Sequence, residues 1–158
     1  MLNPKGKQKC GYITIVGPTN AGKSTLLNSI LGKKLSIVSH KVQTTRTRIQ
    51  AILTKETSQL ILIDTPGLFN PKRFKDRSFI KEAISSLERS DVIVYMVEAH
   101  KGFDKDAYNS LGKMIVNQEI IIIINKIDLV RKPDLLKLMD DIKGKINKND
   151  IYLVSALK

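Results

Sequence analysis

The chain has 158 residues, 42% of them hydrophobic and 27% charged, which suits one globular domain over residues 1–158. Its single cysteine, Cys10, excludes an internal disulfide framework; neither a signal peptide nor the roughly 18-residue apolar run of a membrane-spanning helix is evident, so we expect a cytoplasmic protein. The formal net charge of +12 suggests a polyanionic partner, either nucleic acid or an anionic membrane surface, although solvated lysines explain it equally well.

The predicted elements alternate between short apolar strands and longer amphipathic helices. The stretches 33–46 and 68–78 are polar and show no clear periodicity. In chain order we expect a strand at 11–17, a helix at 23–32, strands at 48–56 and 59–64, a helix at 79–90, a strand at 91–99, a helix at 104–117, a strand at 119–129, a helix at 133–146 and a strand at 151–156.

This alternation predicts a three-layer α/β/α fold around a mostly parallel sheet of six strands. Strands 48–56 and 59–64 are joined by a turn around Glu56–Ser58 that is too tight for a crossover. We therefore expect this pair to be antiparallel, with one antiparallel strand at the edge. A sheet of this kind normally continues into a covering helix, and because the sequence stops at Lys158 we expect the final helix to be missing and the domain to be truncated.

The stretch GPTNAGKST has the spacing Gly-x-x-x-x-Gly-Lys-Ser between a predicted strand and a predicted helix. The glycines let the backbone approach phosphate oxygens, while loop N–H groups and the helix N-terminus offer positive dipole ends. The lysine supplies a charge to the β- and γ-phosphates, and the serine hydroxyl is an expected Mg²⁺ ligand. A glycine-rich turn without a ligand is the disfavoured alternative. We expect nucleotide contacts from Gly17, Asn20, Ala21, Gly22, Lys23, Ser24 and Thr25.

A second candidate element, Asp64-Thr-Pro-Gly67, closes the strand at 59–64. A carboxylate at this edge of a parallel sheet can hold Mg²⁺ through a water, and the Gly67 N–H can then contact a γ-phosphate. Taken alone the tetrapeptide is equally compatible with an ordinary proline turn. Its distance downstream of the phosphate loop favours the nucleotide-binding interpretation.

A third element, Asn125-Lys126-Ile127-Asp128, follows the strand of isoleucines and predicts the choice of base. A carboxylate can accept two N–H bonds from guanine, whereas adenine would leave these groups unpaired at high cost. Asn125 can tie this loop to the phosphate loop, and the Lys126 stem can cover the base. The segment Ser155-Ala156-Leu157 can place a backbone N–H on the guanine oxygen, although only its position supports this role.

These four elements, in this order, resemble those of the translation-factor-type P-loop GTPases, whose fold is Ras-like. With QTTR at residues 43–46 and DTPGLFNPKR after it, the chain is similar over residues 11–157 to the Era family, which is related to the Der and MnmE proteins. The resemblance implies hydrolysis of GTP to GDP and phosphate. It also implies that Thr45, or alternatively Thr44, ligates Mg²⁺ and contacts the γ-phosphate, and that residues 68–77 form a second switch.

Leu68 stands where many switch GTPases have a glutamine that orients the attacking water. An apolar side chain cannot do this, so we expect slow intrinsic turnover by other means. In the related proteins an asparagine of the phosphate loop helps bind a potassium ion, and the resemblance implies this role for Asn20. The expected catalytic set is therefore Asn20, Lys23, Thr45 and Gly67.

The Era family implies small ribosomal subunits and 16S rRNA as partners, through a KH-type domain that we do not expect in residues 1–158. The resemblance therefore implies a monomeric GTPase of ribosome assembly, cytoplasmic or peripheral at the inner membrane, while RNA contact by this chain alone is in doubt. Basic residues in both switch-like stretches would suit an RNA backbone. Two alternatives are a guanine-nucleotide-binding fragment without competent hydrolysis and one domain of a Der-type GTPase.

Overall fold

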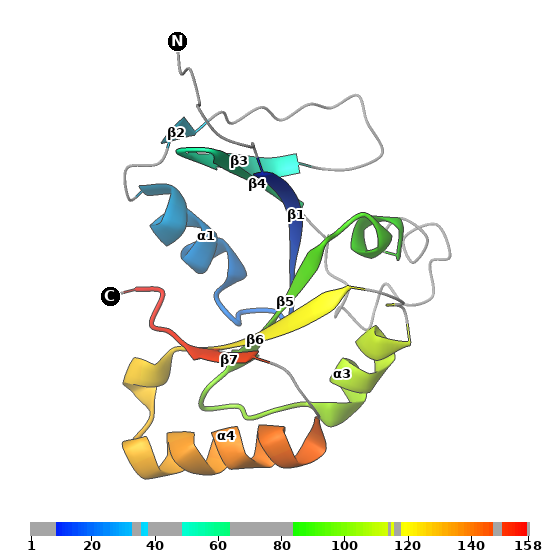
Figure 1. Ribbon diagram of the computed structural model, residues 1–158. Coiled ribbons are helices and arrows are strands. Elements are labelled where there is room, and N and C mark those ends of the chain that lie inside the picture. Colours follow the sequence, from blue (N-terminus) through cyan, green and yellow to red (C-terminus); the bar gives the residue numbers. More distant parts are fainter. Residues whose placement is uncertain are drawn as a thin grey trace.

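The computed structural model describes residues 9–32, 36–37, 49–63, 84–113, 115, 118–146 and 150–157 (Figure 1). Both predicted switch segments fall largely outside these residues. The structure therefore does not test the roles predicted for Thr44, Thr45, Asp64, Gly67 and Leu68.

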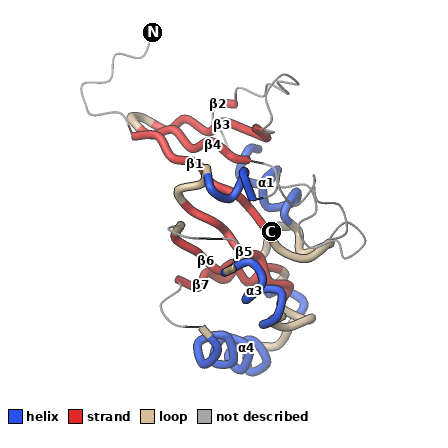
Figure 2. The backbone as a smooth tube through the Cα atoms, turned by 90° about the vertical axis from the view of Figure 1, so that its right-hand side faces the viewer, coloured by secondary structure: helices blue, strands red, loops and turns tan. Residues whose placement is uncertain are grey.

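The described residues form one seven-stranded sheet in the order β2-β3-β4-β1-β5-β6-β7, which Figure 2 shows from β2 at one end to β7 at the other. The core strands are short and rich in isoleucine and valine, as expected for strands that are covered on both faces. Their bounds are β1 Lys9–Val16, β2 Ser36–Ile37, β3 Ile49–Lys55, β4 Ser58–Ile63, β5 Val92–Glu98, β6 Glu119–Asn125 and β7 Asp150–Leu153.

Strand pairing confirms a mostly parallel sheet with one antiparallel strand. β1 pairs in parallel with β4 and β5, and β5, β6 and β7 continue the parallel ladder. β3 runs antiparallel to both β4 and β2. The six predicted strands are present, and the two-residue β2 is added beyond β3, so the antiparallel strand lies one position inside the edge. A strand of two residues carries no periodic signal, which is why the pattern did not predict it.

Three labelled helices and one short helical segment accompany the described strands. α1 is Lys23–Gly32, α3 is Lys105–Gly112 and α4 is Lys132–Lys145, while residues 84–88 are helical within the predicted 79–90. α3 begins where Asp104 accepts a hydrogen bond from the Ala107 N–H, and it ends at Gly112 rather than at the predicted residue 117. Glycine is a poor helix former, so the amphipathic pattern alone overestimated this helix.

Another boundary differs at the end of β6. The prediction extended this strand to residue 129, but the strand ends at Asn125 and Ile127–Leu129 form a short 3-10 helix. Asn125 thus ends the strand, and the rest of the motif, Lys126 to Asp128, lies in the loop that follows it. No helix within the described ranges is long and apolar enough to cross a lipid bilayer.

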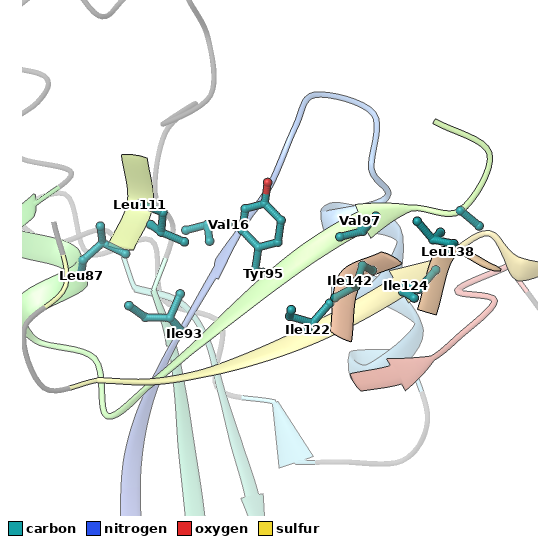
Figure 3. Packing of buried hydrophobic residues seen from close by; sticks show 11 residues of the cluster. Val16, Leu87, Ile93, Tyr95, Val97, Leu111, Ile122, Ile124, Leu138 and Ile142 are labelled. Carbon is teal, nitrogen blue, oxygen red and sulfur yellow. The ribbon is translucent and has the colours of Figure 1, made fainter. Parts of the chain in front are cut away.

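The hydrophobic core lies on both faces of the sheet, and β5 shows how the sequence divides it. Ile93, Tyr95 and Val97 pack with residues of α3 and α4, as Figure 3 shows, whereas Val94 and Met96 pack with Leu26 of α1. Successive strand residues point to opposite faces, so a continuous apolar strand fills two layers at once. α1 therefore covers one face, and α3 and α4 cover the other (Figure 1).

Candidate nucleotide-binding site

The loops that follow β1, β5, β6 and β7 meet at one edge of the sheet. These strands are parallel, so their carboxyl ends share this edge, where ligands of open α/β sheets bind. The loop after β1 leads into α1, and the chain after β7 lies beside the start of α1, where Ala156 packs near Ala21 and Leu26. The segments predicted to bind the phosphates and the base therefore lie together at this edge.

The phosphate loop needs glycine at two positions. Gly17 has φ of 144° and Gly22 has φ of 93°, conformations that residues with a side chain rarely adopt. A Cβ on Gly17 would lie 2.5 Å from the Met96 carbonyl oxygen, and a Cβ on Gly22 would overlap the side-chain amide of Asn125. Asn20 also has positive φ, at 66°. The pattern of glycines in the sequence therefore corresponds to one close approach to the β5 backbone, at Gly17, and one to the Asn125 side chain, at Gly22.

Lys23 is the first residue of α1 and lies across the phosphate loop. Its ammonium group donates hydrogen bonds to the carbonyl oxygens of Gly17, at 2.9 Å, and Pro18, at 2.7 Å. The positive charge is thereby held at the helix N-terminus, where backbone N–H groups also attract anions. This combination suits a phosphate group.

An open cavity of about 390 Å³ lies against this loop. Its volume falls in the range of small-molecule sites, and its lining joins the phosphate loop to the loop after β6. Ala21 lies behind this surface, fully buried, and contributes its carbonyl oxygen to the support of the loop. The residues that line the cavity are Asn20, Gly22, Lys23, Ser24, Thr25 and Lys126.

Asn125 connects three segments at the edge of the sheet. Its buried side-chain amide donates to the Ala21 carbonyl at 2.8 Å, and its amide oxygen accepts from the Ala156 N–H at 3.1 Å. Both ends of the amide are therefore satisfied, as a buried polar group requires. The predicted link from Asn125 to the phosphate loop is present, and the link to Ala156 extends it to the segment after β7.

The base-reading candidates lie on the loop after β6. The Ser155 hydroxyl donates to the Asp128 carboxylate at 2.6 Å, and Asp128 is otherwise exposed. The Ile127 N–H donates to the Val154 carbonyl, which joins the backbones of the two segments. Leu157 is 81% exposed, and the contact predicted for it concerns its backbone.

Sequence reasoning missed Glu98, the last residue of β5. Of the carboxylates that the structure describes, only Glu98 is buried, and it lies close to Lys126, Lys101 and His100. Burial acts to raise the pKa of Glu98, but the ammonium groups of Lys126 and Lys101 outweigh it and lower that pKa below its usual range. The available signal was an acid at the carboxyl end of a buried strand, the argument that was applied to Asp64.

The described residues fit part of a magnesium site. The Ser24 hydroxyl lies on the cavity wall next to Lys23, and Mg²⁺ usually takes few protein ligands together with phosphate oxygens and waters. Asn20 also lines this cavity. The described ranges contain no group of three His, Cys, Asp or Glu side chains that could hold a metal ion.

Comparison with known proteins gives consistent results. GTPase Era of Bradyrhizobium sp. strain BTAi1 is 40% identical over 155 residues, which are 98% of this chain and 50% of that protein. Two solved structures match with a TM-score of 0.74 and 39% identity, over 95% of this chain and 52% of theirs. One is Era with MgGDPNP and a 16S ribosomal RNA fragment, and the other is an Aquifex aeolicus Era variant with GDP and aluminium fluoride.

This chain spans about half the length of the curated relatives and solved Era structures that it matches. A family profile described as "50S ribosome-binding GTPase" matches residues 12–126, which include the phosphate loop and end at Lys126. Because that match covers most of the sequence, the chain belongs to the 50S ribosome-binding GTPase family.

Proposed function

We propose that this chain binds GTP, hydrolyses it slowly to GDP and phosphate, and acts as the switch domain of a protein in small ribosomal subunit assembly. The observation that carries this proposal is one cavity bordered by a phosphate loop and by the loop of Asp128, with Asn125 bonded to both supporting segments. Membership of a GTPase family and the similarity to Era support it.

Guanine selectivity rests on Asp128. Its carboxylate is exposed on the loop after β6 and is oriented by the Ser155 hydroxyl at 2.6 Å. The carboxylate can accept two N–H bonds from guanine, while adenine presents no such pair and would leave the carboxylate unsatisfied. The Ser155–Leu157 backbone supplies the complementary donor for the guanine oxygen. ATP should therefore bind much more weakly than GTP.

Hydrolysis requires stabilisation of the charge that develops on the phosphates while water attacks in line. Lys23 and the N-terminus of α1 hold positive charge at the phosphate end of the cavity, and Ser24 would bind Mg²⁺ there. Magnesium neutralises phosphate charge when it is bound. Thr45, Asp64 and Gly67 would complete the site from the switch segments. No glutamine follows Gly67, which supports slow turnover.

Nucleotide competition tests the proposal directly. A fluorescently labelled GDP should be displaced by GTP and GDP but not by a comparable excess of ATP. With Mg²⁺ present, incubation with GTP should release phosphate. The Lys23→Ala form is the negative control, since it loses the charge held at Gly17 and Pro18. Equal displacement by ATP would contradict guanine selectivity. Tight GTP binding without phosphate release would instead support a binding domain without competent hydrolysis.

We propose potassium dependence through Asn20. Asn20 lines the cavity together with Lys23 and Ser24, and an amide oxygen is a suitable ligand for a hard monovalent cation. Single-turnover hydrolysis should be faster in K⁺ than in Na⁺ buffer, and Asn20→Ala should remove this difference while Asn28→Ala, an exposed site on α1, should keep it. Equal wild-type rates in both salts would refute the role.

We propose 16S rRNA in the small ribosomal subunit as the macromolecular partner, with this chain as a cytoplasmic monomer. The net charge of +12 suits a phosphate backbone, and a similar Era structure contains a 16S ribosomal RNA fragment. Co-sedimentation with small subunits should depend on whether GTP or GDP is present. Binding that does not change with the nucleotide, or binding to anionic vesicles alone, would contradict this partner.

A further inference from the structure

Glu98 places a buried negative charge directly beside the nucleotide cavity without lining it. Its side chain is 2% exposed, and one carboxylate oxygen lies 2.7 Å from the Lys126 ammonium and 3.1 Å from the His100 imidazole. The other oxygen lies 2.9 Å from the Lys101 ammonium. A buried carboxylate is costly unless it is paired, so the two lysine ammonium groups are part of what allows an acid at this position.

The backbone around Glu98 fixes where its carboxylate can reach. Glu98 is paired in register with Asn125, and the Ala99 N–H donates to the Asn125 carbonyl at 2.9 Å. The N–H groups of Lys101 and Gly102 both donate to the Glu98 carbonyl, which closes a tight turn after β5. The backbone around Glu98 is therefore hydrogen-bonded both to Asn125 on β6 and to the turn that follows β5. Asn125 immediately precedes Lys126, so the Glu98 carboxylate starts from a position close to Lys126.

Among the residues that line the cavity, Lys126 is the one whose ammonium group pairs with Glu98. Lys126 lines the cavity with Gly22, Lys23 and Ser24, and its backbone adopts a left-handed conformation with φ of 63°. A lysine side chain is long and loses considerable rotamer freedom when it is held in one geometry. The ion pair at its tip keeps the stem in place before any ligand arrives, which lowers the ordering cost of binding.

We propose that Glu98 is a positioning residue for nucleotide binding, which it supports by holding the Lys126 stem along the cavity wall where the guanosine part packs. The inference rests on the proposed guanine nucleotide binding. Glu98 touches no ligand itself, and its effect passes through Lys126. Lys101 shares the same carboxylate but is not among the cavity-lining residues, so it serves as the matched comparison.

A double-mutant cycle tests this role. Dissociation constants for fluorescent GDP, with dissociation rates, are measured for wild type, Glu98→Gln, Lys126→Met and the double variant, alongside urea unfolding of each. Glu98→Gln should weaken GDP binding by about fivefold to tenfold, mainly through faster dissociation. In the Lys126→Met background the same change should have little further effect, because the side chain that Glu98 holds is gone. Lys101→Met should bind GDP within about twofold of wild type.

The outcomes separate this inference from the proposed function. Wild type that fails to bind GDP contradicts the proposed function itself. Wild type that binds GDP while Glu98→Gln binds equally well, or weakens binding by the same factor with and without Lys126, overturns the positioning role. If Glu98→Gln does not fold, Glu98→Asp keeps the charge but shortens the side chain, and it should show a smaller loss of affinity that also vanishes in the Lys126→Met background.

Discussion

The two ends of the cavity are built from different parts of the chain. At the phosphate end, main-chain atoms make most of the contacts: Gly17 approaches the Met96 carbonyl too closely for a side chain, and Lys23 is held by main-chain carbonyls, while Gly22 packs against the Asn125 amide. At the base end, side chains dominate, with Asp128 held by Ser155 and with Lys126 held by Glu98.

This difference has a functional consequence. A phosphate group is common to all nucleotides, so main-chain geometry at that end can set affinity without distinguishing bases. Side chains at the other end can be exchanged without moving the backbone, so under the proposed function they would select the base. Changes at the phosphate end should weaken the binding of every nucleotide, whereas changes at the base end should alter the preference between guanine and other bases.

The largest expected effect is that of Gly22→Ala. The added Cβ would overlap the Asn125 amide at a residue with φ of 93°, so the loop must shift. We expect binding of both GDP and ATP analogues to weaken, with GDP affinity falling about 1,000-fold, equivalent to about 4 kcal/mol. Gly144→Ala in α4, where a Cβ meets open space, should leave affinity unchanged and stabilise the helix slightly. If fluorescence titration shows that Gly22→Ala binds GDP as tightly as wild type, the main-chain geometry at the phosphate end does not set affinity.

Asp128→Asn should change the preference between bases. The amide offers a donor where guanine presents one, so we expect GDP to bind about 100-fold more weakly while xanthosine diphosphate binds better than to wild type. Asp134→Asn on α4 removes a carboxylate that pairs with Arg131 instead, and it should leave both affinities unchanged. Competition titrations with the two diphosphates measure the ratio. A uniform loss for both would mean that Asp128 supports the loop rather than reading the base.

The Glu98 charge should contribute stability that depends on pH. Lys126 and Lys101 lower the pKa of this carboxyl below its ordinary value of 4.5 despite burial, with His100 adding to the effect. The contribution is therefore complete above pH 4.5 and is lost as the pH falls through the lower, folded-state pKa. Relative to Glu98→Gln, wild type should be more stable near neutral pH, and this difference should shrink as the pH falls below 4.5. A difference that is constant with pH in urea unfolding would contradict the charge assignment.

Ser155→Ala should have the smallest effect. It removes the 2.6 Å hydrogen bond that orients the Asp128 carboxylate, leaving the carboxylate itself in place. We expect GDP affinity to fall about fivefold, close to 1 kcal/mol, with no change in the preference for guanine. Ser110→Ala on α3, whose hydroxyl donates to a helix carbonyl, is a control with a similar loss of one hydrogen bond. A loss as large as that of Asp128→Asn would mean that orientation, not charge, limits binding.

The phosphate loop could be predicted from sequence because its spacing carries most of its geometry. Gly17 and Gly22 stand in the pattern at the two positions where the structure has large positive φ, and the helix begins at Lys23 as expected. Apolar runs likewise predicted the long strands. The two-residue β2 and the end of α3 were missed, because they depend on strand pairing and on one poor helix former rather than on periodicity.

The base end was harder to predict because it depends on residues far apart in the chain. The contact between Asn125 and Ala21 was anticipated only from the motif order, and the pairing of Glu98 with Lys126 was not anticipated, since an acid after an apolar run reads simply as the end of a strand. The roles of Thr45, Asp64 and Leu68 stay predictions, since these residues lie outside the described ranges.

Under the proposed function, the position of Asn125 would link nucleotide binding to folding. Because one side-chain amide joins the loop after β1 to the segment after β7, both are ordered when the chain folds, and little of their entropy remains to be lost when a ligand arrives. Partial opening of this corner of the molecule would release both loops together. Nucleotide residence time should therefore shorten at urea concentrations well below those that unfold the sheet.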